Sequence, residues 1–150
     1  MRNKKSYMRC YEGGLVFNFT PTDQIKQINQ IYHHPNNFKW ADEGRDFEIT
    51  ENPNWIHFNI EEDGISYGLI TLKRMTDTDY EIHMAPLPNL FGNAVRMGAE
   101  LLVCLARLIP DTTLWTYIAP QNRLAVRMMS RLGFIPKAHN IYQRGLKWVE

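Results

Sequence analysis

Two side chains that accept protons stand two residues apart in the segment YEIHMA. Glu81 and His83 share one face if residues 80–85 form a strand, because alternate residues of a strand point to the same side. A carboxylate and an imidazole are common general bases. Each also has a simpler interpretation, Glu81 as a solvated carboxylate and His83 as a hydrogen-bonded histidine of the sheet.

The segment NLFGNA, residues 89–94, precedes a long apolar run and offers different chemistry. Gly92, Asn93 and Ala94 fall where the expected helix begins, and the first N–H groups of a helix have no partner within it. Such groups bind anions such as phosphate. The alternative is a glycine-containing turn before a buried helix, which the loop alone favours. Arg96 and Arg127 are the cations that could reach a bound phosphate.

The other reactive side chains do not predict a site. Adjacent histidines do not share a helix face, and isolated ones lack ligand spacing, so we predict no metal site. Two cysteines form no disulfide framework, which favours a reducing compartment. These residues are His33, His34, His57, His139, Cys10 and Cys104.

Size and composition favour an ordinary globular protein. With 150 residues, 44% hydrophobic and 22% charged, we expect residues 1–150 to form one domain. A net charge of +1 gives no attraction of the whole molecule for nucleic acid or anionic lipid, although local patches remain open. No stretch reaches the length of a membrane span, and the basic start lacks an apolar signal region. We therefore expect a cytoplasmic protein with neither membrane nor nucleic acid as partner.

The expected elements begin with a polar segment, residues 1–14, that is loose or at a sheet edge. Strand formers at 15–19 predict a strand, and residues 20–23 supply a cap, a proline and an acidic first turn for a helix. The apolar stripe of that helix runs to about residue 33. A short helix is expected at 37–42.

An antiparallel meander follows, with strands at 55–60, 65–72 and 80–85 separated by turn signals. After Gly92, a segment that is apolar nearly all round predicts a helix buried against the sheet and ended by Pro110. Residues 114–118 then predict a strand, and two last strands are expected within residues 135–149.

The helix after residue 118 has clear boundary signals. Asn122 is placed as its N-cap and Gly133 as the left-handed residue after its end. The apolar face predicted for this helix comprises Leu124, Ala125, Met128, Met129 and Leu132.

The spacing in this helix resembles the final motif of the GNAT N-acetyltransferases, which here comprises Asn122, Ala125, Met128, Gly133 and Phe134. NLFGNA is similar to a degenerate form of the family's Gln/Arg-x-x-Gly-x-Gly/Ala loop, and the expected element order is the GNAT order. In overall look the chain also resembles GNAT-like proteins of tailed phages. The resemblance implies an α/β (α+β) fold, with a mixed, mostly antiparallel sheet of six to seven strands flanked by about four helices.

The resemblance also implies acetyl-CoA as co-substrate, bound where the fourth strand parts from the fifth near Pro86. An alkyl amine with a pKa of about 10.4 must lose a proton before it attacks a thioester, and Glu81 or His83 would take that proton. A backbone N–H near Met84 or Ala85 would polarise the carbonyl. The implied cofactor-binding residues are Met84, Ala85, Gly92, Asn93, Ala94, Asn122 and Arg127.

The sequence departs from the family at Met129, where a tyrosine often protonates the leaving thiolate. A thioether cannot donate a proton, so Tyr117, Tyr142 or water would have to substitute. We predict an N-acetyltransferase acting by direct attack of an amine carried by a small molecule or a protein, and a homodimer stays open. The alternatives are a non-catalytic GNAT-fold protein that binds acetyl-CoA or a protein partner, and a structural or host-interaction protein without cofactor.

Overall fold

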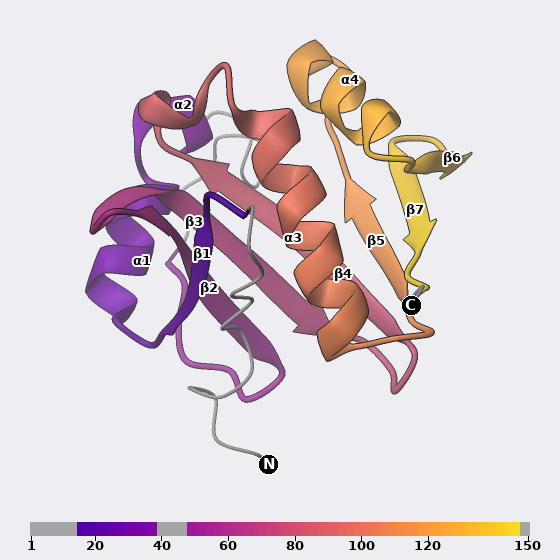
Figure 1. Ribbon diagram of the computed structural model, residues 1–150, viewed down its shortest axis with the longest axis horizontal. Helices are drawn as coiled ribbons and strands as arrows, with labels where there is room; N and C mark the ends of the chain where they lie inside the picture. The colour runs from indigo at the N-terminus through magenta and orange to yellow at the C-terminus, as the bar shows by residue number, and fades with distance from the viewer. Residues whose placement is uncertain (1–14, 39–47, 148–150) are drawn as a thin grey trace.

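The computed structural model describes residues 15–38 and 48–147, which build one seven-stranded sheet and the helices around it (Figure 1). The strand order is β1-β2-β3-β4-β5-β7-β6, and every neighbouring pair is antiparallel except β4 with β5. The predicted mixed, mostly antiparallel sheet is therefore confirmed. The strands are β1 (Asn18–Thr22), β2 (Trp55–Glu62), β3 (Ile65–Arg74), β4 (Asp79–Pro86), β5 (Thr113–Tyr117), β6 (Ile135–Ala138) and β7 (Ile141–Gly145).

Helices cover the two faces of the sheet unequally. They are α1 (Ile25–Tyr32), α2 (Pro35–Phe38), α3 (Ala94–Leu108) and α4 (Arg123–Arg131), with a 3-10 turn η3 at Pro88–Leu90. Figure 1 shows α3 crossing the sheet and α4 at the upper ends of β5 and β7. The α3 face carries the larger core, with Ile70, Ile82 and Leu105 buried, and the α1 face carries a smaller one around Ile28 and Leu69.

The position of the first strand differs from the one predicted from the sequence. A strand was expected at 15–19 with residues 20–23 starting a helix, but β1 runs from Asn18 to Thr22 and includes Pro21. β1 pairs with β2 alone and therefore lies at the sheet edge, where a proline's missing N–H does no harm. The helix α1 begins afterwards with Gln24 as an N-cap that makes no side-chain bond.

Two further predictions need correction. The short helix expected at 37–42 is α2, Pro35–Phe38, and residues 39–47 lie outside the described part, as do 1–14 and 148–150. Leu124, expected on the buried face of its helix, is 73% exposed. It stands in the first turn of α4, while the buried contact with the core is made further along, at Met128 and Leu132.

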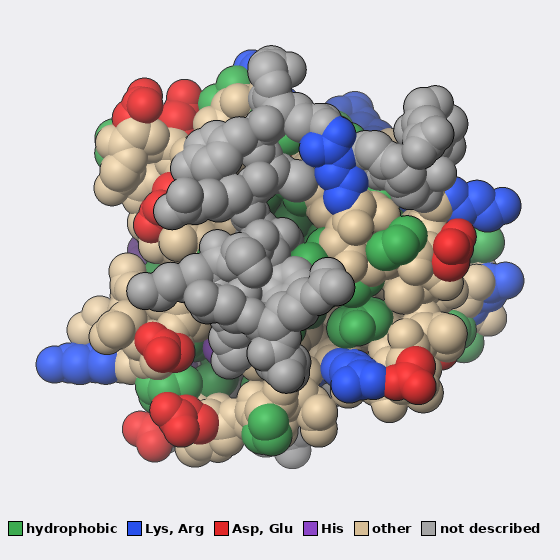
Figure 2. Space-filling model, turned by 60° about the horizontal axis from the view of Figure 1, so that its bottom comes forward, with side chains coloured by type: hydrophobic (Ala, Val, Ile, Leu, Met, Phe, Trp, Pro, Cys, Tyr) green, Lys and Arg blue, Asp and Glu red, His purple; other side chains and the backbone are tan. Residues whose placement is uncertain are grey.

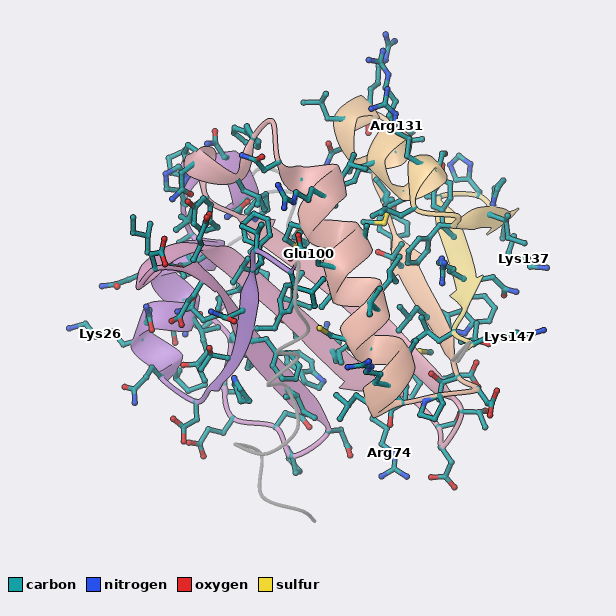
Figure 3. The ribbon with its side chains drawn as sticks, in the orientation of Figure 1. Lys26, Arg74, Glu100, Arg131, Lys137 and Lys147 are labelled. Atoms are coloured by element: carbon teal, nitrogen blue, oxygen red, sulfur yellow. The ribbon has the colours of Figure 1, made fainter. Side chains whose placement is uncertain are left out.

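A buried carboxylate ties the start of the described chain to α3. Glu100 is 6% exposed, and its Oε1 accepts hydrogen bonds from the backbone N–H groups of Val16 at 2.5 Å and Phe17 at 2.9 Å. Arg96 contacts the other oxygen, with Nε 3.3 Å from Oε2. Figure 3 shows Glu100 midway along α3. Charge-assisted bonds of this kind compensate for burying the carboxylate. Among the described helices, none is long and apolar enough to cross a membrane.

Candidate functional site

The separation of β4 from β5 dominates the site region and divides the sheet into an N-terminal half (β1–β4) and a C-terminal half (β5, β7 and β6). The two strands pair only at residues 79–81 with 113–115. The sequence placed the separation near Pro86, but pairing ends earlier, after Glu81. β5 stays paired with β7 along its whole length, so it follows β7 away from β4. The later residues of β4, up to Pro86, have no partner on the β5 side among the described residues.

Side chains fill most of the space beside this separation on the α3 face. A cavity of about 30 Å³ remains. Its walls are apolar except at Thr116 of β5. It is lined by Ile70, Ile82, Met84, Met97, Gly98, Leu101, Leu102, Thr116, Met128, Met129, Leu132 and Phe134.

The helix α4 has the boundaries that its sequence predicted. The Asn122 side chain accepts a hydrogen bond from the N–H of Ala125, with 3.4 Å between N and O. After the helix, Gly133 has φ +85° and donates to Ser130 O, while Phe134 donates to Met129 O. This pair of bonds is a Schellman motif, which only a left-handed residue at position 133 permits.

Contact between α4 and α3 depends on a small residue of α3. A Cβ added to Gly98 would lie 2.4 Å from Cδ1 of Leu132 and 3.2 Å from Cε of Met128. Gly98 therefore lets α4 approach closely and seats the C-terminal half on α3. No local pattern in the sequence distinguishes this glycine.

The loop before α3 leaves the start of that helix open. Gly92 has φ +92°, and a Cβ built there would meet nothing within 4 Å. Asn93 is the N-cap but its side chain makes no capping bond, and the first turn has no acidic residue. Gly92 and Asn93 are both exposed. The partial positive charge of this helix end therefore faces open space without a compensating side chain.

A second glycine, in β3, packs against the end of β4 from which this loop leaves. Gly68 of β3 has φ +131° and pairs with Pro86. A Cβ there would lie 2.4 Å from the carbonyl oxygen of Ala85 and 2.8 Å from Cα of Pro86. The close approach of these two backbones fixes where β4 ends, and the N–H of Leu87 continues the contact by donating to Tyr67 O at 2.9 Å.

Glu81 and His83 lie together on the α1 face, as their spacing indicated. Nε2 of His83 is 2.6 Å from Oε1 of Glu81, and about 30% of each side chain is exposed, 29% for His83 and 32% for Glu81. The hydrogen bond from His83 is the main cause that lowers the pKa of Glu81; partial burial opposes it, and Lys73 lowers it further. An ionised Glu81 can only accept, so Nε2 of His83 carries the donated proton and Nδ1 is left as the basic nitrogen when the ring is neutral.

A buried polar chain lies beside this pair on the same face. Thr71 is the cross-strand partner of His83, and its Oγ1 is 2.8 Å from Nδ1 of His57 and 2.6 Å from the hydroxyl of Tyr32. Burial raises the pKa of Tyr32 to about 12, although the bond with Thr71 opposes the shift. These bonds link α1 to β2 and β3, so His57, which was expected to be isolated, has a partner in Thr71.

The residues considered for proton donation lie on different faces. Met129 lines the cavity, so the thioether does stand at the strand separation. Tyr142 pairs with Thr116 on that same face, whereas Tyr117, 52% exposed, lies on the opposite face with Trp115. Thr116 is the polar residue that sequence reasoning missed, although alternation along β5 places it beside buried Leu114.

Within residues 15–38 and 48–147, no group of three or more His, Cys, Asp or Glu side chains is arranged to hold a metal ion. Cys104 is buried, and Cys10 lies outside the described residues.

No protein-family model and no curated protein matches this sequence. Solved structures do match. The spermidine N-acetyltransferase from Vibrio cholerae, solved with CoA and spermine, is 13% identical with a TM-score of 0.72, over 87% of this chain and 96% of that one. The Campylobacter jejuni N-acetyltransferase PseH, in complex with acetyl coenzyme A, is 20% identical with a TM-score of 0.54, over 65% and 71%. The GNAT domain of S. lividans PAT is 8% identical with a TM-score of 0.67, over 87% and 89%.

This chain has the GNAT fold. At these identities the likeness concerns the fold, and the fold prediction made from Asn122 to Phe134 and the element order is thereby confirmed. In the GNAT fold of this chain, the strand separation, the open start of α3 and the Glu81–His83 pair all belong to β4 or to the loop that follows it.

Proposed function

We propose that this protein is an N-acetyltransferase that moves an acetyl group from acetyl-CoA to an amine by direct attack. The observation that carries the proposal is the separation of β4 from β5 after Glu81. Beside this separation, the α3 face presents apolar side chains and the α1 face presents Glu81 and His83. Structural neighbours solved with CoA or acetyl coenzyme A support the choice of co-substrate.

On the α3 side, the open start of α3 fits a diphosphate. The N–H groups of Gly92 and Ala94 would donate to it, since a helix start attracts anions. The N–H of Asn93 already donates to Leu90 O at 2.9 Å, so Asn93 would contribute its exposed side chain. Arg127, exposed on α4, would add a positive charge, and Asn122 would border the channel at the start of α4. Arg96, considered for the same role, is instead paired with Glu100.

The pantetheine arm needs more room than the cavity of about 30 Å³ offers. Four of the lining residues are methionines, Met84, Met97, Met128 and Met129. Methionine is unbranched and changes rotamer at low cost, so these side chains can move aside without disturbing the backbone. Binding would then be accompanied by a rearrangement of the methionines, which also distinguishes this channel from a preformed one.

On the α1 side, His83 is the better proton acceptor of the pair. The lowered pKa of Glu81 makes that carboxylate a weak base, whereas its bond to Nε2 leaves Nδ1 of His83 able to take the amine proton. Glu81 then acts as a positioning residue that holds the ring and stabilises its charged form. The spermine bound to the V. cholerae neighbour supports an amine acceptor.

The backbone of β4 beyond Glu81 would polarise the thioester carbonyl. Met84 and Ala85 lie where no strand pairs on the β5 side, so an N–H there is available for the oxygen on which charge develops. The attacking nitrogen forms its bond to the carbonyl carbon, the carbon–sulfur bond breaks, and the thiolate leaves as coenzyme A. Met129 supplies no proton, so Tyr142 or water would protonate the thiolate.

Binding is tested first, with a substitution that should act in opposite directions on stability and affinity. Asn93→Asp adds a negative charge to the start of α3, which we expect to stabilise the helix by about 0.5 kcal/mol and to weaken coenzyme A binding about tenfold. Gln24→Glu, at the start of α1, is the matched control that should stabilise without changing affinity. Denaturant unfolding measures the stability of both variants, and calorimetric titration with coenzyme A measures their affinity. Equal affinity in the two variants would contradict the phosphate site.

Activity is tested by release of free thiol from acetyl-CoA in the presence of polyamines, amino sugars and peptide amines. His83→Ala should lower kcat/KM by about 100-fold or more, and Glu81→Gln less, with a shifted pH profile. His139→Ala, at an exposed position, is the control. Coenzyme A binding without turnover of any amine would favour the non-catalytic alternative, and no binding would overturn the proposal.

A further inference from the structure

Charge is unevenly distributed along this chain. Six Lys or Arg residues and no Asp or Glu lie between residues 112 and 147. Residues 1–111 contain 11 Lys or Arg and 15 Asp or Glu, and the remaining carboxylate is Glu150. The net charge of +1, from which we expected no nucleic-acid partner, is therefore the sum of an acidic N-terminal part and a strongly basic C-terminal one. The six basic residues are Arg123, Arg127, Arg131, Lys137, Arg144 and Lys147.

These cations are available to a partner. All are exposed except Arg144, which is half-buried and donates to the carbonyls of Leu132 and Gly145. None of the ion pairs between described residues involves this part of the chain. In the space-filling view, Lys and Arg side chains project from the right-hand edge, whereas most acidic side chains of that face lie to the left (Figure 2).

The basic side chains follow one side of the molecule. Arg123, Arg127 and Arg131 recur every fourth residue along α4, so each step advances about 6 Å along one stripe of the helix. Figure 3 shows Arg131 at α4 and Lys137 and Lys147 further down the same side, which β6 and β7 form. Lys26 lies on the opposite side of the molecule, and Arg74 lies at its lower end, outside the elements that carry this series.

We propose that this basic side, formed by α4, β6 and β7, binds the phosphodiester backbone of a nucleic acid. A linear series of cations fits a linear polyanion, and three of the five exposed ones are arginines, whose planar forks match phosphate oxygens. Binding of this kind is governed by the backbone and is independent of base sequence.

The arrangement fits a nucleic acid better than a lipid surface. A membrane-docking surface places cations and apolar side chains on one plane. Here the exposed apolar residues are divided: Leu124 lies on α4, whereas Ile135 and Ile141 follow the register of Trp115 and Tyr117 onto the opposite face of the sheet. They cannot enter one lipid surface together.

The test measures fluorescence anisotropy of labelled single-stranded and duplex DNA and RNA between about 50 and 200 mM salt. The test variant combines Arg131→Gln, Lys137→Gln and Lys147→Gln, and it omits Arg127 because that residue belongs to the proposed cofactor site. The control combines Lys26→Gln, Arg74→Gln and Arg107→Gln, which changes the net charge equally. We expect the test variant to bind at least about tenfold more weakly and the salt slope to fall by about 0.7–0.9 per cation removed.

Four outcomes would overturn the inference: no binding at the lowest salt, equal weakening in the control, tighter binding to phosphatidylserine vesicles than to any oligonucleotide, or loss of oligonucleotide binding at saturating coenzyme A. The last would assign these cations to the phosphates of the cofactor. The inference is independent of the proposed acetyl transfer, because the test variant should keep its affinity for coenzyme A, and Asn93→Asp should keep its affinity for the oligonucleotide.

Discussion

The N-terminal and C-terminal halves of the sheet are built differently. In the N-terminal half, β2 and β3 span 8 and 10 residues, and helices pack on both faces. In the C-terminal half, the strands span 4 or 5 residues, α4 covers one face, and Tyr117, Ile135 and Ile141 are exposed on the other. Three residue pairs of β4 and β5, together with the contact of α4 on α3, join the halves.

This difference indicates that continuously paired strands hold the proposed acid–base residues, whereas residues of α4 and β5 form the facing wall of the proposed channel. His83 is held by continuous pairing of β4 with β3, so its position is fixed. The methionines of α4 lie across the gap, where β5 pairs with β4 at three residue pairs. A channel that must open for a cofactor arm is better bounded by one fixed side and one yielding side than by two fixed ones.

The largest expected effect is a break in the N-terminal half at Gly68. Gly68→Ala places a Cβ 2.4 Å from a backbone oxygen, so strands must shift, and we expect a loss of about 3 kcal/mol in unfolding free energy. Gly64→Ala is the control, since Gly64 also has a positive φ but meets nothing within 4 Å. Denaturant unfolding compares the stability of the two variants. Equal losses of unfolding free energy would show that the positive φ, and not the contact with Ala85, causes the loss.

The next effect concerns the buried Tyr32, which belongs to the N-terminal half. Between its ordinary pKa of 10.0 and its raised pKa of about 12, the unfolded chain ionises this tyrosine and the folded chain does not. Stability should therefore fall as pH rises through that window, by up to about 3 kcal/mol from this group. Tyr32→Phe should remove that part of the loss, and Tyr117→Phe, at an exposed position, should not. Identical pH slopes in all three proteins would refute the assignment.

A smaller effect is expected from a substitution at the contact between the halves, where α4 packs on α3. Gly98→Ala gains about 1 kcal/mol of helix propensity but overpacks Leu132, so we expect a net loss of about 1 kcal/mol. Hydrogen exchange should speed up in β5 and β7 more than in β2 and β3. Ala99→Gly, on the exposed side of α3, is the control for propensity alone. An equal rise in exchange rate in both halves would contradict the idea that Gly98 holds the C-terminal half against α3.

The smallest effect is the acid dependence of the Glu81–His83 pair. Because the pKa of Glu81 is lowered in the folded state, its contribution is present above the ordinary value of 4.5 and is lost as pH falls below it. Glu81→Gln should flatten stability in that acid range, whereas Glu51→Gln, at an exposed position, should leave the slope intact. Thermal unfolding at a series of acid pH values measures this dependence of stability on pH in each protein.

Local patterns in the sequence predicted the elements whose cause is local. Asn122 and Gly133 fix the ends of α4 through bonds within a few residues, and alternation in YEIHMA places Glu81 beside His83. The edge strand β1 was misplaced, since Pro21 looks like a helix start until its pairing with distant β2 is known. Leu124 was wrongly expected to be buried, because the spacing of apolar residues along a helix does not show which of its turns pack against another element.

The features that the sequence did not reveal depend on contacts between distant segments. Gly68 and Gly98 are small because of what packs on them, at Ala85 and Leu132, and no pattern within their own elements says so. The point at which β4 leaves β5 is set by the pairing of β5 with β7. The roles of the proposed site residues stay predictions until the binding and activity measurements are made.

The bond between Glu100 and the first described residues sets a practical limit on shortening this protein. Deleting the chain through Phe17 would strip both main-chain donors from a carboxylate that is 6% exposed, leaving Arg96 as its partner among the described residues. An orphaned ion in an apolar interior costs about 3–5 kcal/mol, a large part of what keeps a domain of this size folded. A trimmed expression version should therefore retain Leu15, or carry Glu100→Gln as a companion change.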